Sequence, residues 1–116
     1  MVANWDEWIK ETNPQPDATD VPVDTLVSII FHQDINRHTL NTRNILILDG
    51  SHGGTLISNR FLYRYDSDLK TLFIYLKDDA DRFKPNNKIE IIVTGRISNY
   101  KNVKMGIPFH LIFTTR

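Results

Sequence analysis

The sequence contains no cysteine among its 116 residues. This absence excludes a disulfide framework and any metal site built on thiolates. The fold must therefore rest on an apolar core. With 41% hydrophobic residues, a chain of 116 residues is long enough to bury one such core as a single domain.

The sequence also lacks an excess of charge of either sign, because 14 Lys and Arg residues balance 14 Asp and Glu residues. Nucleic acids and anionic membranes attract proteins through clustered positive charge. We therefore expect no nucleic acid and no membrane as a partner. A net charge near zero also permits self-association, because copies of the chain repel one another little.

A long apolar run is missing from the first residues, MVANWDEWIKETNPQ. A secretory leader and a membrane anchor both need such a run, so we expect no signal peptide in this chain. We therefore expect the chain to be made in the cytoplasm. A chain cut from a longer secreted protein is the alternative.

The first residues hold two tryptophans. Trp5, Trp8 and Ile9 follow one another at helical spacing, and Asn4 is a suitable N-cap. The sequence therefore predicts a short N-terminal helical segment over residues 4–11. It is too short to be stable alone and must dock on a surface.

Residues 13–24 read NPQPDATDVPVD and predict an extended edge segment, because proline fixes the backbone and removes a hydrogen-bond donor. After it, apolar residues recur at every second position in several short runs separated by turn residues. Six or seven strands at intervals of about ten residues are typical of an all-β sandwich. The predicted core residues are Val27, Ile29, Phe31, Leu72, Ile74, Ile91, Val93, Leu111 and Phe113. Ile35, Leu40 and Phe83 are expected to plug the ends of that core.

Six segments follow one another in a characteristic order: PDATDVPVD, LVSIIF, DINRHTLNTRNILILDG, YRYDSDLKTLFIYL, DRFKPNNKIEIIVTG and PFHLIFTT. In this order they resemble the bacterial Ig-like domain family of S-layer and other modular surface proteins. The resemblance covers about residues 13–115. It departs from the family before the last strand, where SNYKNVKMG replaces an Asp-x-x-Gly-Asn turn.

The resemblance implies an immunoglobulin-like antiparallel β-sandwich of about seven strands. Residues 13–116 are expected to form this domain, and residues 1–12 a separate tryptophan-containing segment. Domains of this family usually serve as spacers, adhesive modules or assembly modules, on cell surfaces and in phage virions. Of these two settings, the missing apolar leader and the starting methionine favour a phage virion component over a bacterial cell-surface module. The resemblance implies no active site.

Residues with metal or catalytic chemistry are scattered. The four histidines, His32, His38, His52 and His110, show no i, i+2 or i+4 spacing, so no local metal pair is predicted. Calcium is the alternative for the acidic loop, with Asp78, Asp79 and Asp81 as the preferred ligands. Asp66 and Asp68 are expected to cap a turn instead.

Two further patterns have simple interpretations. The glycines of DGSHGGT lack the lysine of a phosphate-binding loop, and the adjacent Ser51 and His52 are poorly placed as a nucleophile and its base. Basic residues interleave with Tyr63, Tyr65 and Tyr100, which could stack bases, but solvated strand faces explain the pattern more simply.

The strands carry more apolar residues than one buried face requires. The surplus residues are Leu26, Ile30, Leu46, Leu48, Phe73, Tyr75, Ile92 and Ile112. Three coverings are possible: the turn at residues 35–40, the tryptophan segment, or another subunit.

These observations favour a non-enzymatic module, without a cofactor or metal, that binds other protein subunits of an assembly, with a homo-oligomer as one option. The expected partner-binding residues are Trp5, Trp8, Ile9, Phe73 and Tyr75. The alternative is a carbohydrate-binding module that recognises cell-surface glycan. Its aromatic platforms would be Trp5, Trp8, Tyr75 and Tyr100.

Overall fold

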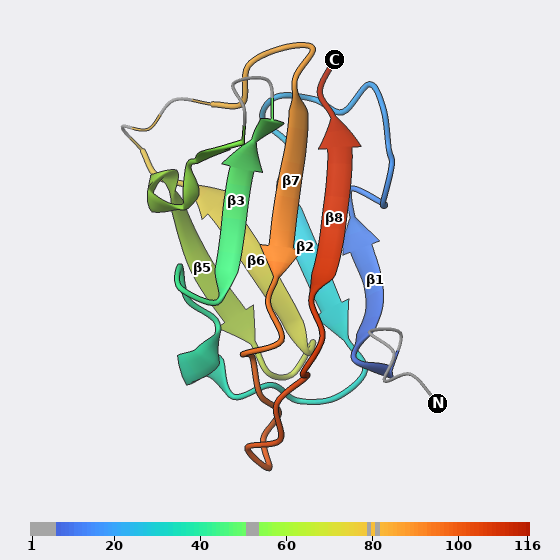
Figure 1. Ribbon diagram of the computed structural model, residues 1–116, viewed down its shortest axis with the longest axis vertical. Helices are drawn as coiled ribbons and strands as arrows, with labels where there is room; N and C mark the ends of the chain where they lie inside the picture. Colours follow the sequence, from blue (N-terminus) through green and yellow to red (C-terminus); the bar gives the residue numbers. More distant parts are fainter. Residues whose placement is uncertain (1–6, 51–53, 79, 81) are drawn as a thin grey trace.

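The chain forms two antiparallel sheets that pack face to face (Figure 1). The computed structural model describes residues 7–50, 54–78, 80 and 82–116. The first sheet has the strand order β1-β2-β6-β5 and the second has the order β4-β3-β7-β8. The strands are β1 (Ile9–Asn13), β2 (Val27–Phe31), β3 (Ile45–Asp49), β4 (Thr55–Leu56), β5 (Phe61–Asp66), β6 (Thr71–Leu76), β7 (Lys88–Val93) and β8 (Phe109–Thr114). This architecture confirms the predicted all-β sandwich, with eight strands where the sequence predicts about seven.

Helical structure is confined to short 3-10 turns in the described ranges, among them η2 (Arg37–Thr39) and η4 (Ser58–Arg60). No helix in these ranges is long and apolar enough to cross a membrane. Residues 55–65, which the sequence presents as one extended run, divide into β4, η4 and β5. The Ser58 hydroxyl in η4 accepts a hydrogen bond from the Ile47 N–H at 2.8 Å.

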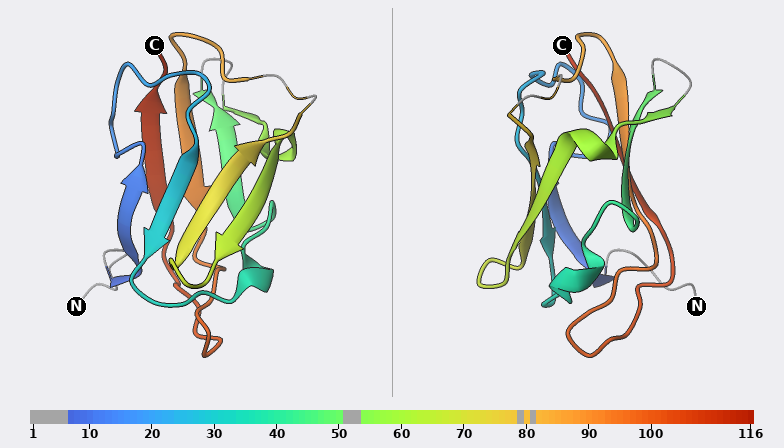
Figure 2. Two further views of the ribbon diagram at one scale, coloured as in Figure 1. Left: turned by 180° about the vertical axis from the view of Figure 1, so that it is seen from behind. Right: turned by 90° about the vertical axis from the view of Figure 1, so that its left-hand side faces the viewer.

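The core lies between the two sheets, which Figure 2 shows edge-on. Every predicted core residue is buried there, and none is more than 2% exposed. Alternate residues of each strand point inward, so Val27 lies opposite Ile74 and Ile29 lies opposite Leu72 in the first sheet. The period-2 pattern of the sequence therefore fixes which face of each strand is buried.

The N-terminal helix that the sequence predicts is not shown by the described part of residues 4–11, where only Glu7 has helical (3-10) backbone. Ile9–Asn13 form strand β1, which pairs with β2, while residues 4–6 lie outside the described ranges. The pairing shifts by a bulge between Ile9 and Glu11, so the buried residues of β1 are Ile9 and Thr12. The boundary expected between residues 12 and 13 falls inside this strand.

The proline-rich segment carries the chain from the first sheet to the second. Beyond Pro14 and Pro16, the Asp17 N–H donates to the Ile112 carbonyl of β8 at 2.6 Å. Val21 forms a parallel bridge with Thr115 at the end of the same strand. Residues 17–21 therefore cover the outer edge of β8. This placement agrees with the extended edge segment that the prolines predict.

The loops close both ends of the core. Ile35 and Leu40 are buried on either side of η2, and Phe83 contacts the Phe61 and Phe113 rings at centroid distances of 5.4 and 5.7 Å. These placements confirm the residues expected to plug the core. The connection between β7 and β8, which the sequence presents as a surface loop, also buries Ile97 and Met105.

Candidate functional site

The residues that the sequence indicates for partner contact do not lie on one surface. Trp8 and Ile9 are only 8% and 3% exposed and belong to the domain's own core. Phe73 and Tyr75 lie on the outer face of β6, away from that core. Trp5 lies outside the described residues.

The outer face of the first sheet gathers apolar side chains around Tyr75. Because Leu72 and Ile74 point inward, Phe73 and Tyr75 point outward. Tyr75 lies opposite Leu62 of β5, and its ring centroid is 6.2 Å from that of Phe73. We call this surface the β6 patch; its members are Leu26, Ile30, Leu62, Phe73 and Tyr75.

Three members of the β6 patch are well exposed: Leu62 at 56%, Leu26 at 42% and Tyr75 at 39%. Single apolar residues on a surface need no explanation, whereas neighbouring ones indicate an interaction site. Polar residues flank the patch, because Phe73 lies between Ser28 on β2 and Arg64 on β5. The β6 patch therefore has the apolar centre and polar rim of a protein interface.

Leu62 is a member of the β6 patch that is not among the predicted contact residues. The run FLYRY at residues 61–65 alternates, and the structure turns Phe61, Tyr63 and Tyr65 inward, which leaves Leu62 and Arg64 outside. Assigning a face to this run would have singled out Leu62 as an outward apolar residue. Its proximity to Tyr75 comes from strand pairing, which no local pattern reveals.

A cleft of about 410 Å³ adjoins the β6 patch at one end of the sandwich. Leu26 and Tyr75 line it together with buried Phe61, Ile74 and Phe83. Charged residues also line it: Asp24, Lys77, Asp78 and Arg82. The cleft thus offers an apolar floor and a charged rim, and it suits an apolar side chain of a partner better than chemistry on a substrate.

No metal-binding cluster of three or more histidine or acidic side chains occurs within the described ranges. His110 pairs with Glu90 at 2.7 Å on the outer face of the second sheet, whereas His32 and His38 lie in the loop after β2. His52 and Ser51 lie outside the described residues. In the acidic loop, Asp78 lines the cleft, and Asp79 and Asp81 are also outside the described residues.

Of the two aspartates expected to cap the turn before β6, Asp66 has this role, whereas no hydrogen bond of the Asp68 carboxylate occurs within the described residues. The Asp66 carboxylate accepts hydrogen bonds from the N–H groups of Asp68 at 3.0 Å and Leu69 at 3.3 Å. These bonds cap the turn between β5 and β6.

Two tyrosines of β5 have altered acidity. Burial raises the pKa of Tyr63 to about 12, and its hydroxyl donates to the Ile45 carbonyl of the facing sheet at 2.7 Å. Burial, followed by the hydrogen bond to Asp34, also raises the pKa of Tyr65 to about 12. Both phenols stay protonated at neutral pH and act as hydrogen-bond donors.

The aromatic residues considered for sugar stacking are not brought together. Tyr75 lies near the end of β6, at the end of the sandwich with the cleft, whereas Tyr100 lies in the β7–β8 connection at the opposite end (Figure 1). Trp8 is buried in the core. Only Tyr75 and Tyr100 among the described members of this set are exposed, and they share no surface.

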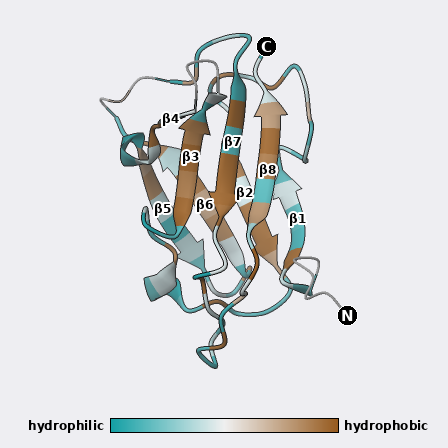
Figure 3. Cartoon of the chain, in the orientation of Figure 1, coloured by the Kyte–Doolittle hydropathy of each residue, from teal (hydrophilic) through white to brown (hydrophobic). Residues whose placement is uncertain are grey.

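The second sheet carries apolar residues on both faces, and its strands β3, β7 and β8 have long brown stretches in Figure 3. Those on its outer face are Leu46, Leu48, Ile92 and Ile112, each half-buried. The hydrogen-bonded pair of Glu90 and His110 interrupts this face at its centre, because Glu90 lies opposite Ile112 and His110 lies opposite Ile92. None of these four residues is exposed as Leu26, Leu62 and Tyr75 are, which makes the β6 patch the better candidate.

Similar sandwiches occur in several solved structures. The surface layer protein SbsC, domains 1–6, matches with a TM-score of 0.61 at 12% identity, covering 93% of this chain and 13% of that one. Escherichia coli alpha-2-macroglobulin matches with a TM-score of 0.59 at 14% identity, over 83% of this chain and 5% of that one. The chain thus spans a small part of both proteins. CopC from Methylosinus trichosporium OB3b matches with a TM-score of 0.59 at 14% identity, covering 93% of this chain and 91% of that one.

These identities support a shared fold and no more. No curated protein matches the chain in sequence. A family model described as "Bacterial Ig-like domain" matches residues 8–115. This match begins before the residue 13 expected from the sequence, in agreement with a first strand at Ile9–Asn13. The chain therefore belongs to the bacterial Ig-like domain family.

Proposed function

We propose that this domain is a non-enzymatic structural module that binds another protein subunit through the β6 patch. The observation that carries the proposal is the outward pairing of Leu62 with Tyr75, beside Phe73 and next to the cleft. This surface replaces the expected contact surface around Trp8 and Ile9, whose side chains are buried within the domain.

The chemistry of the β6 patch suits recognition by area burial. Phe73 and Tyr75 supply aromatic anchors, and burying a side chain of this size contributes roughly 1.5 to 3 kcal/mol. Arg64 and Ser28 supply polar groups beside them that fix the register of a partner. The balanced charge, with 14 basic and 14 acidic residues, leaves a second copy of the chain as one suitable partner.

The proposed setting is a bacterial cell-surface assembly. The likeness to a domain of an S-layer protein supports it, although at 12% identity that likeness concerns the fold. A phage virion is the alternative setting for the same contact function. The neighbouring genes separate the two, since surface-anchoring repeats indicate the former and capsid or tail genes the latter.

The test compares two exposed leucines. Leu62 is 56% exposed inside the β6 patch, and Leu69 is 59% exposed on the turn between β5 and β6. A photo-cross-linking amino acid is placed at either position and activated in the assembly that contains the protein. We expect a discrete cross-linked protein species from position 62 and none from position 69.

Equal cross-linking from both positions, or none from position 62, would contradict the proposal. A glycan array with the unmodified chain and a Tyr75→Ala variant examines the carbohydrate alternative. Specific glycan binding that disappears in Tyr75→Ala, without protein cross-links, would favour that alternative.

A further inference from the structure

The outer edge of β5 is unprotected, unlike the other sheet edges in the described ranges. β1 is interrupted by a bulge, β4 has two residues, and residues 17–21 cover the end of β8. Bulges, short strands and covering segments are the usual means by which proteins prevent pairing at sheet edges. β5 has six residues in regular register with β6 and shows none of these three devices.

The pairing pattern shows which backbone groups face outward from this edge. The Lys77 N–H donates to the Arg60 carbonyl at 2.9 Å, so these two residues form a hydrogen-bonded pair. In an antiparallel ladder such pairs alternate, so Leu62 and Arg64 also direct their backbone groups toward β6. The N–H and C=O groups of Tyr63 and Tyr65 consequently point away from the sheet.

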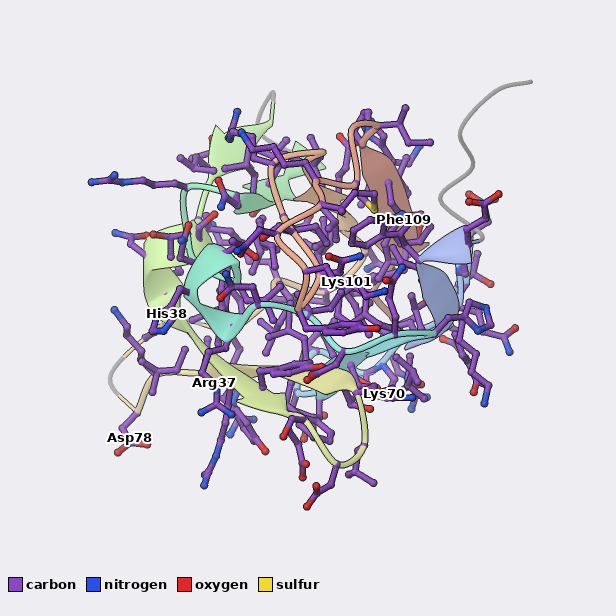
Figure 4. The ribbon with its side chains drawn as sticks, turned by 90° about the horizontal axis from the view of Figure 1, so that it is seen from below. Arg37, His38, Lys70, Asp78, Lys101 and Phe109 are labelled. Atoms are coloured by element: carbon purple, nitrogen blue, oxygen red, sulfur yellow. The ribbon has the colours of Figure 1, made fainter. Side chains whose placement is uncertain are left out.

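A hollow of about 470 Å³ lies beside this edge. Tyr63, Arg64 and Tyr65 line it from β5, and Arg37, His38 and Leu40 line it from η2 and its end. Figure 4 shows Arg37 and His38 together on η2, next to β5. A strand added to β5 would run about 4.8 Å from it, alongside this hollow.

The hollow has a basic lining. Arg37, His38 and Arg64 are exposed, and no carboxylate lines the hollow in the described part of the chain. The nearby Asp34 and Asp66 carboxylates accept hydrogen bonds from Tyr65 and from the turn at Asp68, respectively. Neither arginine forms an ion pair within the described residues.

We propose that the β5 edge binds an extended acidic peptide segment of another protein by strand addition. The backbone groups of Tyr63 and Tyr65 would supply the ladder hydrogen bonds, and Arg37, His38 and Arg64 would attract the acidic side chains. The same positive charges disfavour edge-to-edge pairing with a second copy, because they would face one another. The occupant is therefore a different chain of opposite charge. This site adjoins the β6 patch and shares Arg64 with its polar rim, whereas Arg37 and His38 belong to the β5 edge site alone.

The probe is a short peptide of alternating glutamate and valine, blocked at both ends. Its affinity for the full chain is measured by calorimetry, and amide hydrogen exchange at Tyr63 and Tyr65 is followed by NMR. We expect binding to slow exchange at these two amides. The same peptide with lysine in place of glutamate should bind at least about tenfold more weakly.

Two further comparisons separate strand addition from simple charge attraction. Two peptides are compared, N-methylated at the odd or at the even residues. Methylation of the residues whose N–H groups face β5 should abolish binding, because it removes the donors of the ladder hydrogen bonds. Methylation of the other residues should have little effect on binding. The Arg37→Glu/Arg64→Glu variant should bind the peptide at least about tenfold more weakly than the unmodified chain. The control is the Lys10→Glu/Lys88→Glu variant, which has the same change in net charge at exposed sites on β1 and β7. Its affinity for the peptide should stay within about twofold of that of the unmodified chain.

Circular dichroism and melting establish that both variants fold. Equal binding of the two N-methylated peptides, or equal binding by the two charge variants, would overturn the proposal. Tight binding of heparin with no effect of peptide N-methylation would instead assign the hollow to anionic polysaccharide, and it would overturn the proposal as well.

Discussion

The Tyr65 hydroxyl donates a hydrogen bond to the Asp34 carboxylate at 2.5 Å and accepts one from the Ile35 N–H at 3.0 Å. One phenol thus attaches the loop after β2 to strand β5. The same loop also contacts the β7–β8 connection, because Ile35 bridges to Asn99. The Tyr65 hydroxyl therefore helps to hold together the end of the sandwich opposite the cleft.

We predict that Tyr65→Phe lowers the free energy of unfolding by about 1 to 2 kcal/mol, because it leaves the Asp34 carboxylate and the Ile35 N–H without this partner. Urea denaturation measures the loss. Tyr75→Phe is the matched control, since the Tyr75 hydroxyl forms no hydrogen bond within the described residues, and it should cost less than about 0.5 kcal/mol. Equal losses in the two variants would contradict the structural role of Tyr65.

The stability of the domain should fall as the pH rises from about 10 to about 12. The pKa of Tyr63 and of Tyr65 is raised in the folded state from 10.0 to about 12, mainly by burial. Over this window the unfolded chain releases phenol protons that the folded chain retains, so unfolding becomes more favourable with increasing pH. Below pH 10 both phenols are protonated in the folded and in the unfolded chain, so these two residues do not make the free energy of unfolding depend on pH.

Urea midpoints measured across this window check that expectation. The double variant Tyr63→Phe/Tyr65→Phe should show a shallower decline than the unmodified chain, because it lacks both shifted groups. A decline of the same steepness in the double variant would show that other groups cause it.

Trp8 should contribute to folding rather than to partner contact. It is 8% exposed, and its carbonyl accepts a hydrogen bond from the His32 N–H at 2.9 Å. We expect Trp8→Ala to cost about 3 to 5 kcal/mol, as large-to-small changes in a core do. The melting temperature should consequently fall by roughly 10 °C or more.

Lys10→Ala serves as the control on the same strand, since Lys10 is exposed and its truncation should leave the melting temperature within about 2 °C. If Trp8→Ala melted like the unmodified chain but lost self-association, Trp8 would belong to an interface, as the sequence alone suggests.

Gly95 lies where the chain after β7 meets the chain before β8. A Cβ atom at this position would lie 2.5 Å from the Gly106 carbonyl carbon and 2.7 Å from the Ile107 nitrogen. Both obstructing atoms belong to backbone, so no side-chain rotation relieves the clash. Gly95→Ala should therefore cost about 3 kcal/mol or more, at the upper end for overpacking.

Gly54→Ala is the comparison for Gly95→Ala. No atom lies within 4 Å of its added Cβ, and only its positive φ of 77° opposes the change. The cost there should be about 1 kcal/mol. A smaller loss from Gly95→Ala than from Gly54→Ala, measured by urea denaturation, would contradict the close approach of the two loops.

Most strands and the core were predictable because their burial alternates strictly. In β7, for example, Ile89, Ile91 and Val93 point inward and are fully buried, so the sequence itself displays the period of the sheet. Strand β1 was not predictable, because burial does not alternate along it. Its bulge places the buried residues at Ile9 and Thr12, so they do not alternate, and the helix was predicted from the spacing of Trp5, Trp8 and Ile9 instead.

The candidate site was predictable only in part. Phe73 and Tyr75 stand out because they alternate with the buried Leu72 and Ile74. Leu62 completes the β6 patch through its pairing with Tyr75, and such a pairing depends on the register of two strands. The β5 edge likewise became visible only once the strand order of each sheet was known.

The pairing of residues 17–21 with β8 has a mechanical consequence. The two segments run parallel, with the Val21 N–H donating to the Thr114 carbonyl and the Arg116 N–H donating to the Val21 carbonyl, at 3.1 and 2.8 Å. β1 begins at one end of the sandwich and β8 finishes at the other (Figure 1). Tension applied between these two ends acts along the strands. The hydrogen bonds between residues 17–21 and β8 lie across this direction, so the tension loads them in shear and all at once, and they do not break one after another. Separating these two ends therefore requires the hydrogen bonds between residues 17–21 and the end of the chain to break together.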